Sequence, residues 1–160
     1  MENSLGRILM KDCTKDAIIN AEIQLRKISS IIKLKGRKIL TNYPITPPQF
    51  IALQWLIEEE ELTIGELSKK IGLAFSTTTD LVDRMEKTEL VVRVKDSNDK
   101  RVVRIHVLDK GKDIINEVIK KRQNYLGELL DGFTEEQTDQ LNELLGLLLQ
   151  QMENVSKESN

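Results

Sequence analysis

The stretch that decides the fold is STTTDLVDRMEKTELVVRVKDSNDKR, residues 76–101. Its first part predicts a helix, because Leu81, Val82 and Met85 form an apolar face and charged residues fill the rest. Its second part is rich in β-branched residues that alternate with polar ones, which is typical of a strand. The helix opens with four consecutive hydroxyl residues, although serine and threonine are mediocre helix formers. A cap needs only one of them, so the run asks for another explanation.

A second β-branched run follows and predicts a two-stranded ribbon. LVVRV (90–94) and VVRIHV (102–107) both alternate, and KDSNDKR (95–101) between them reads as a polar turn. The tip of this ribbon carries three cations: Lys95, Lys100 and Arg101.

Two short helices are predicted before the hydroxyl-rich one. TPPQ (46–49) combines a threonine cap, a proline at the first helical position and a glutamine three residues after the cap, so a helix of about 47–59 follows. In LTIGELSKKIG (62–72), Thr63 caps the next helix and Gly72 ends it. The second of these helices and the hydroxyl-rich helix are joined by a tight turn, and the hydroxyl-rich helix is polar at its start. This arrangement matches a helix-turn-helix. The ribbon after them makes the unit a winged helix.

Long amphipathic helices flank this unit. Residues 15–41 repeat apolar side chains at spacings of three and four, and a second long helix runs from about Asp109 to 131. A capping signal at Thr134 opens a last, leucine-rich helix. A small core cannot bury all of this apolar surface, so a second copy of the chain is expected to cover it. The predicted fold is mainly α: a winged helix-turn-helix with a two-stranded β-wing (46–108) lies between an N-terminal dimerisation helix (1–45) and C-terminal dimerisation helices (109–160).

Composition narrows the class of protein. Hydrophobic residues make up 39% of the 160 residues and charged residues 31%, which suits a soluble helical protein. A single cysteine excludes an intramolecular disulfide, and a single histidine argues against a zinc site, so no cofactor is expected. No apolar run is long enough to cross a bilayer and no signal peptide opens the chain, so a cytoplasmic protein is expected. No nucleophile paired with a base and no glycine-rich phosphate loop is found, so an enzyme is not expected.

The hydroxyl run has a functional interpretation in a helix-turn-helix. The first residues of the second helix face base edges in the major groove, where serine and threonine can donate, accept and offer a methyl group. The ribbon tip can reach a neighbouring minor groove, where a narrow A·T tract favours arginine, and Asp99 could hold Arg101 in place. The alternative is that the hydroxyls only cap an ordinary helix and the tip is a solvated turn.

The set of motifs resembles the multiple-antibiotic-resistance regulator (MarR) family of bacterial transcription factors. The resemblance rests on ITPPQFIALQWL, LTIGELSKKIGL, DKGK and the opening stretch, and it covers about residues 15–155. Its most specific element is the spacing of Asp83, Arg84, Arg93, Asp99 and Arg101. The resemblance implies a homodimer whose two winged helices each bind one half of a palindromic operator on double-stranded DNA. It also implies a repressor that a small phenolic or lipophilic ligand, or oxidation, releases.

The resemblance assigns roles to residues by their positions. The major groove would be read by Ser76, Thr77 and Thr79, with Asp80 close to the same bases. Arg84 would support a backbone contact. On the wing, Arg101 would enter the minor groove with Asp99 bracing it, beside Lys95 and Lys100. A ligand pocket would lie near Tyr43 and Trp55, although a tryptophan in so aromatic-poor a chain also suits the core.

The chain departs from the family pattern at three places. Glu89 stands where the family usually has glycine, so the turn after the helix is expected to close without a residue of positive φ. Leu108 replaces a usual threonine cap, and Asp109 is expected to take over the capping. Asp80 would repel phosphate and could accept from a cytosine amine, so the operator can differ from those of relatives.

Two alternatives to a ligand-controlled regulator remain open from the sequence. Cys13 could make the chain a redox sensor, although it lies far upstream of the position at which some relatives carry a reactive cysteine. The overall negative charge, with Asp80 and Glu89, would also suit a winged-helix protein-interaction module that has lost DNA binding.

Overall fold

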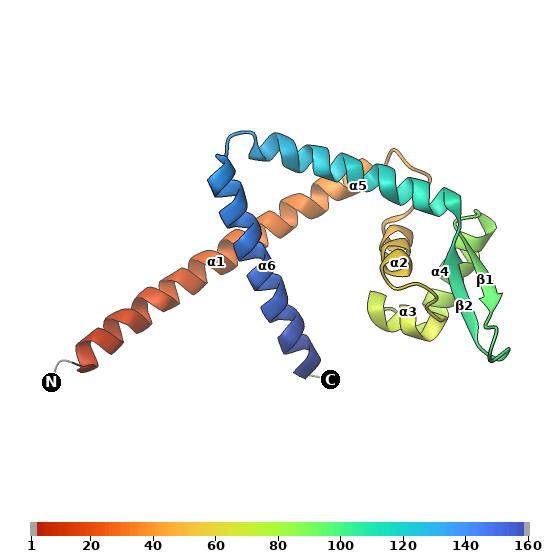
Figure 1. The fold of residues 1–160 in the computed structure, drawn as a ribbon, viewed down its shortest axis with the longest axis horizontal. Coiled ribbons are helices and arrows are strands. Elements are labelled where there is room, and N and C mark those ends of the chain that lie inside the picture. Colours follow the sequence, from red (N-terminus) through yellow and green to blue (C-terminus); the bar gives the residue numbers. More distant parts are fainter. Residues whose placement is uncertain (1–2, 159–160) are drawn as a thin grey trace. The chain divides into compact units, whose positions relative to one another are not determined.

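The computed structural model describes residues 3–158 and the side chains of residues 15–156. The chain packs as two compact units, Met1–Val118 and Ile119–Asn160. The described part is mainly helical with one two-stranded antiparallel sheet, which confirms the predicted fold class (Figure 1). Its elements in chain order are α1 (Asn3–Leu40), α2 (Pro47–Glu58), α3 (Ile64–Ile71), α4 (Phe75–Lys87), β1 (Val91–Lys95), β2 (Val103–Val107), α5 (Asp109–Leu130) and α6 (Glu135–Glu158).

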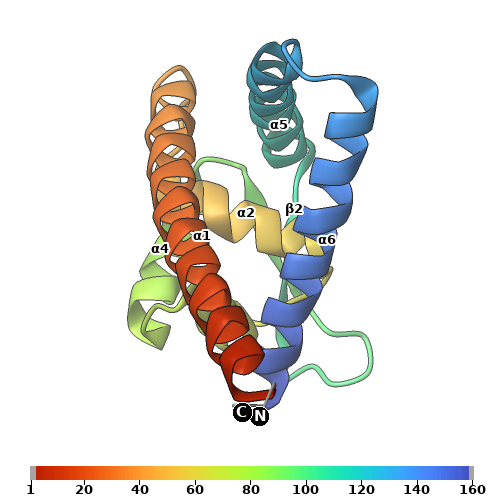
Figure 2. The same cartoon turned by 90° about the vertical axis from the view of Figure 1, so that its left-hand side faces the viewer.

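The first helix is longer than the periodic pattern predicts. It begins at Asn3 rather than near residue 15 and continues without a break to Leu40 (Figure 2). Residues 3–14 contain no proline, so nothing in them interrupts the hydrogen-bonded backbone, although the regular apolar spacing starts only at Ile18. The last turn is the part of α1 that packs into the first unit, because Ile39 and Leu40 are buried there.

The caps predicted for the two short helices are present. The side chain of Gln49 accepts a hydrogen bond of 2.9 Å from the Thr46 N–H at the start of α2. At the start of α3, the carboxylate of Glu66 accepts from the Thr63 N–H at 2.8 Å. Gly72 ends α3 in the left-handed conformation with φ of 67°. These caps satisfy donors that a helix start otherwise leaves open, so they set where the short helices begin.

The wing is an antiparallel pair whose register runs from Val91 opposite Val107 to Lys95 opposite Val103. The loop before α3 adds a short third segment, because the Ile105 N–H donates to the Leu62 carbonyl at 2.9 Å. The sequence does not indicate this segment, because two residues are too few to show a strand period. The wing is therefore attached to the helix-turn-helix through its backbone.

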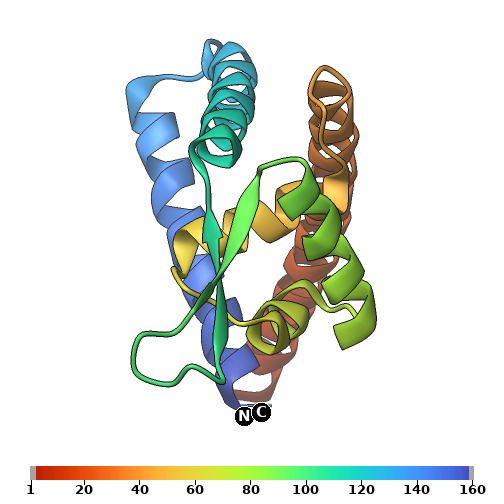
Figure 3. The ribbon, with the colours of Figure 1, turned by 90° about the vertical axis from the view of Figure 1, so that its right-hand side faces the viewer.

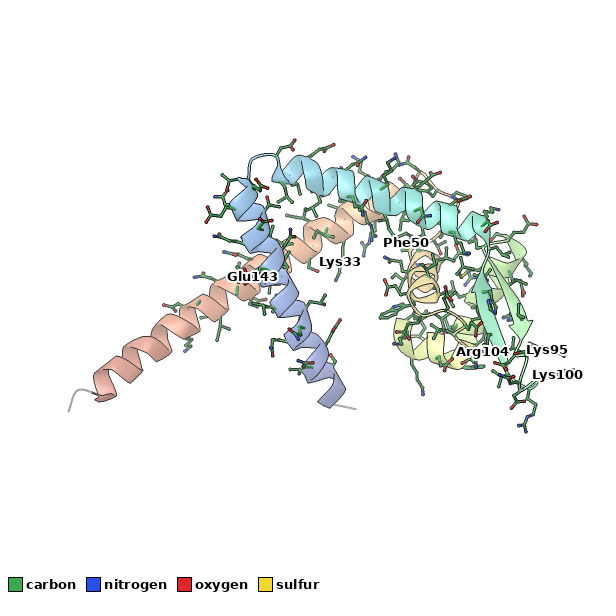
Figure 4. All side chains as sticks on the ribbon, in the orientation of Figure 1. Lys33, Phe50, Lys95, Lys100, Arg104 and Glu143 are labelled. Carbon is green, nitrogen blue, oxygen red and sulfur yellow. The ribbon has the colours of Figure 1, made fainter. Side chains whose placement is uncertain are left out.

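One apolar core holds the winged helix together. Its fully buried side chains come from all three short helices and the sheet, and α5 adds Ile115 and Val118. Phe50, labelled in Figure 4, is the largest of them and is 1% exposed. Trp55 is only half-buried, so it is not part of the fully buried centre. The other principal members are Leu53, Leu67, Met85, Leu90 and Ile105.

The start of α5 passes very close to the backbone just before β1 and to the end of β2. Gly111 is buried there, and a methyl group at its position would lie 2.6 Å from the Leu90 carbonyl oxygen and 2.9 Å from Cγ1 of Val107. The Leu90 carbonyl is fixed in turn, because it accepts a hydrogen bond of 3.0 Å from the Leu108 N–H. Only glycine fits this crossing without displacing backbone, which gives the glycine of DKGK a structural reason.

The turn after α4 does not close as the sequence suggests. Glu89 itself adopts the left-handed conformation, with φ of 60°, so the expectation that the turn avoids positive φ is wrong. The Leu90 N–H donates to the Met85 carbonyl at 2.9 Å, a bond across the helix end that requires a left-handed residue between them. Glycine adopts this backbone geometry most easily, so a glutamate at this position lowers the stability of the fold.

Replacing Glu89 by glycine is expected to raise the free energy of unfolding by about 1 kcal/mol, because the side chain no longer strains a left-handed residue. Urea denaturation of Glu89→Gly beside wild type measures the gain. Glu89→Ala is the control, since it removes the charge and keeps the strained Cβ. An equal gain in both variants would show that charge, not backbone strain, is responsible.

The start of α5 has no side-chain cap of the usual kind. Asp109 is already the first helical residue, so the cap position belongs to Leu108 and the expected takeover by Asp109 is wrong. The Leu108 carbonyl accepts from the Lys112 N–H at 3.1 Å, but an apolar side chain cannot accept from the open N–H groups of the first turn. Asp109 still places a negative charge at the positive end of the helix.

Leu108→Thr is therefore expected to stabilise the protein by roughly 0.5–1 kcal/mol, because a threonine hydroxyl can accept from the first turn of α5. The thermal midpoint should rise accordingly, and Leu108→Ala should not raise it. A gain from alanine equal to that from threonine would mean that removal of a half-exposed leucine, not a new cap, produced the change.

The second unit consists of the later part of α5 and α6. The predicted capping box opens α6, since Thr134 N–H donates to the Gln137 side chain at 3.0 Å and Gln137 N–H donates to the Thr134 hydroxyl at 3.2 Å. Along α6 a run of large apolar side chains is exposed: Leu144, Leu145, Leu147, Leu148, Leu149, Met152 and Val155. Within residues 3–158 no helix combines the length and apolarity needed to cross a membrane.

Candidate nucleic-acid interface

The hydroxyl run lies in the first turn of α4 and divides into two pairs. The Thr78 side chain is fully buried and its hydroxyl donates to the Ala74 carbonyl at 3.0 Å. The Thr79 hydroxyl donates to the Phe75 carbonyl at 2.9 Å. Both hydroxyls thus bond back to the preceding turn, which uses their donors and leaves mainly their methyl groups to contact anything else.

The other pair faces solvent. Ser76 and Thr77 are exposed, and neither hydroxyl has a hydrogen-bond partner among the described side chains and backbone. Asp80 is exposed one turn later, and the Arg84 Nε donates to the Asp80 carbonyl at 3.2 Å. The exposed start of α4 therefore offers two open hydroxyls and one carboxylate. Arg84 lies further along the same helix and is also exposed.

Asp96 organises the wing tip. Its Oδ1 accepts from the backbone N–H groups of Asn98 at 2.8 Å and Asp99 at 3.1 Å, and its Oδ2 accepts from Arg104 Nε at 2.6 Å. The backbone closes the loop, since the Asp96 N–H donates to the Val102 carbonyl at 3.0 Å. Figure 4 shows Arg104 on the wing near Lys95 and Lys100. The hydrogen bond from Arg104, and then those from the two backbone groups, lower the pKa of Asp96 to about 2.

This pKa makes the stability of the wing depend on pH. The pKa of folded Asp96 lies below its ordinary 3.8, so its contribution is present above pH 3.8 and is lost as pH falls toward 2. The urea midpoints of wild type and Asp96→Asn should differ by a constant amount near neutral pH and converge in that acidic window. In an Arg104→Gln background the convergence should largely disappear. An unchanged difference at pH 2.5 would contradict this assignment.

Arg101 lies beyond this turn and is held by Asp99. The guanidinium donates twice to the carboxylate, from Nε to Oδ1 at 3.0 Å and from Nη2 to Oδ2 at 2.9 Å. The Arg101 side chain is nevertheless 90% exposed. The hydrogen bond from Arg101 lowers the pKa of Asp99, which keeps the carboxylate charged. The predicted brace is thus present: a two-point contact fixes the direction of a fully solvated arginine.

A second arginine, Arg93, connects α4 to the wing, and the sequence alone gives it no role. Arg93 on β1 contacts Asp83 at 2.6 Å and Glu86 at 2.7 Å. Glu86 also accepts from the Arg93 backbone N–H at 2.9 Å. The two acidic residues lie three apart on one face of α4, and that spacing is the signal that could have revealed the contact. The backbone and the side chain of Arg93 therefore both link the wing to α4.

A third arginine joins the wing to the loop before α3. Besides Asp96, Arg104 contacts the Glu61 carbonyl, which accepts from Nη1 at 2.9 Å. Glu61 adopts the left-handed conformation, with φ of 66°, and this points its carbonyl toward the wing. No pattern in the sequence predicts this contact, because it depends on a backbone angle 43 residues away in the chain.

The two aromatic residues proposed for a ligand pocket contact different elements. The Trp55 ring lies under the Lys70 ammonium, 5.0 Å from the ring centroid, and Lys70 also pairs with Glu59. Tyr43 lies near Glu117 of α5; partial burial, and then the charge and hydrogen bond of Glu117, raise its pKa. A pocket at these residues stays a prediction. The Cys13 side chain lies outside the described ones, so its redox role also stays a prediction.

A cavity of about 410 Å³ lies between the end of α2, β2 and the start of α5. Its floor is apolar, from Leu56 and Ile105, and its rim carries Glu60, His106 and Lys112. Neither Tyr43 nor Trp55 lines it.

The fold and these surfaces define a winged helix-turn-helix of the kind that binds DNA. The family model described as MarR family matches residues 45–103. The uncharacterized HTH-type transcriptional regulator YsmB of Bacillus subtilis (strain 168) is 60% identical over 120 residues, covering 75% of this chain and 82% of the relative. The chain belongs to the MarR family and is a DNA-binding transcriptional regulator, not an enzyme.

Solved structures agree with this membership. A MarR family protein from Bacillus stearothermophilus has 54% sequence identity and a TM-score of 0.82, covering 86% of this chain and 96% of that one. The transcriptional regulator Tm0710 from Thermotoga maritima has 34% identity and a TM-score of 0.70, covering 84% of this chain and 95% of that one.

Proposed function

We propose that the protein is a cytoplasmic, homodimeric repressor that binds a palindromic operator and is released by a small phenolic or lipophilic ligand. The winged helix (46–108) would bind DNA, and the flanking segments (1–45 and 109–160) would form the dimer. In the major groove the readers would be Ser76, Thr77, Thr79 and Asp80, with Arg84 near the backbone. On the wing they would be Lys95, Lys100 and Arg101, with Asp99 as the brace.

The observation that carries this proposal is the state of Arg101. An arginine on a loop normally loses rotamer freedom when it binds, and that loss weakens binding. Here the contact with Asp99 fixes the side chain in advance while leaving it 90% exposed. Stability gains little from so exposed a pair, so positioning explains the arrangement better than folding does. Figure 3 shows the wing tip and the first turn of α4 at the same end of the winged helix, with α3 between them.

Exposed apolar side chains support the dimer. The described part of α1 exposes seven large ones: Ile18, Ile19, Leu25, Ile28, Ile31, Ile32 and Leu34. The exposed leucines of α6 form a similar run. Soluble monomers rarely leave such continuous apolar surfaces open to water. A second copy would cover them symmetrically and place two winged helices at the spacing of two half-sites.

Release by a ligand requires that the ligand bind unequally to two arrangements of the dimer. Tyr43 and Trp55 are proposed to lie at this site. Both are half-buried aromatic residues on segments next to the proposed dimer helices, so a flat apolar ligand could contact them without opening the core.

Fluorescence anisotropy tests the proposal. The duplex that wild type selects from a random-sequence library, and a scrambled duplex of equal length, are titrated across a salt series. We expect the selected duplex to bind at least 10³-fold more tightly, with an affinity that falls steeply with salt. Light scattering should give twice the mass of one chain. If no sequence is selected, or both duplexes bind equally, the proposed sequence-specific regulator is wrong and a protein partner becomes the better explanation.

A further inference from the structure

An exposed phenylalanine begins the recognition helix. Phe75 is the first residue of α4 and is 62% exposed, next to the open hydroxyls of Ser76 and Thr77. One edge of its ring lies over Gly65 in the first turn of α3, where Cε2 is 3.9 Å from the position that a Cβ would occupy. Even a Cβ at this position would only touch the ring at an ordinary van der Waals distance, so α3 supports one edge of the ring without enclosing it, and most of the ring faces solvent.

This exposure is not explained by folding. A phenylalanine left in water forgoes most of the stabilisation that its burial would give, and nothing in the core needs its ring. It is also the one aromatic side chain in an otherwise polar helix start. The exposed ring is therefore explained if a binding partner covers it. The same partner must also form hydrogen bonds with the neighbouring hydroxyl groups.

The base edges of the major groove are such a partner. Thymine is the only base that presents an apolar group there, its C5 methyl, and phenylalanine is among the residues that contact it. The first residues of a recognition helix are the ones that reach base edges. A phosphate or sugar would gain little from a benzyl ring, so the ring discriminates between bases and does not simply add affinity.

We propose that Phe75 is a specificity-determining residue that recognises a thymine by its methyl group, one in each half-site. This rests on the proposed sequence-specific binding. It assigns the operator one position at which the methyl matters and at which neither Ser76 nor Thr77 supplies the contact.

A base–protein double-mutant cycle tests the assignment. Each thymine of the selected duplex is replaced in turn by deoxyuridine, symmetrically in both half-sites, which removes the methyl and keeps all hydrogen-bonding groups. Wild type and Phe75→Ala are titrated with every duplex. One position should weaken wild type by about fourfold per half-site, as expected for returning one methyl group to water. At that position Phe75→Ala should bind the thymine and the deoxyuridine duplexes equally.

The controls separate this idea from its rivals. Phe133→Ala removes another exposed ring, from the loop between α5 and α6, and should keep the wild-type deoxyuridine profile. If Phe75→Ala and wild type respond alike to deoxyuridine at every position, the assignment is wrong although the regulator stands. If Phe75→Ala binds every duplex more weakly but keeps the wild-type deoxyuridine profile, Phe75 has a structural role. If its affinity for DNA is unchanged, the exposed ring serves a protein partner instead. If wild type selects no duplex, it is the proposed function that fails.

Discussion

Gly111→Ala should destabilise the protein by about 3 kcal/mol, because an added methyl group has no space between α5 and β1. The methyl would stand 2.6 Å from the Leu90 carbonyl oxygen, well inside van der Waals contact. That carbonyl is part of the backbone and is already hydrogen-bonded to Leu108, so it cannot rotate away as a side chain would. Relief requires the start of α5 to move off the wing, which loosens the packing of Ile115 as well.

Urea denaturation and the thermal midpoint measure this loss, which should lower the midpoint by roughly 10 °C in a chain of this size. Gly127→Ala is a matched control in the same helix, because a Cβ at that position meets nothing within 4 Å. It should stabilise by up to about 1 kcal/mol through helix propensity alone. Equal behaviour of the two variants would mean that the close approach at Gly111 does not constrain the fold.

Arg101→Ala should weaken binding to the selected duplex by about 100-fold in the dimer, since each of two wings loses a contact of about 1–3 kcal/mol. The slope of log affinity against log salt should fall by about two, one for each lost charge. Folding should be unaffected, because the side chain is almost entirely in water. Anisotropy across a salt series gives both quantities.

Two neighbours make the interpretation of this result specific. Asp99→Ala keeps the charge of Arg101 but removes its brace, so it should lower the preference for selected over scrambled DNA without lowering the salt slope. Lys100→Ala should do the reverse, because a lysine near phosphate adds affinity for any sequence. If Arg101→Ala behaves like Lys100→Ala, Arg101 contributes charge alone and its fixed direction has no role in recognition.

Local signals in the sequence were sufficient for much of the fold. The capping residues Thr63 and Gly72 and the alternation of β-branched residues each depend on neighbours a few positions away, and the structure has all of them. The brace between Asp99 and Arg101 is of the same kind, since its partners are two residues apart. Short-range chemistry of this sort can be derived from one chain without knowing its tertiary structure.

The features that the sequence does not predict depend on how distant segments pack together, or on an effect that outweighs the local preference. Glu89 shows that the path of the chain imposed a left-handed residue even without glycine, so tertiary packing outweighed local preference. The contacts of Arg93 and Arg104 join segments that approach only after folding. The exposure of Phe75 was hidden for the opposite reason: an aromatic residue beside a helix start is ordinarily assigned to the core. The roles of these residues on DNA stay predictions until binding is measured.

The arginine contacts also bear on how such a regulator could be switched. Arg93 on β1 holds that strand against α4, and Arg104 on β2 holds the other strand of the wing against the loop before α3. Because both strands of the wing are linked to the helices in this way, the winged helix has little freedom to bend internally. A signal that acts on the winged helix would therefore move it as a rigid body, which changes its position along the DNA groove and not its shape. If a ligand releases the protein as proposed, replacing Arg93 or Arg104 should therefore weaken DNA binding even without the ligand and should reduce the further change that the ligand causes.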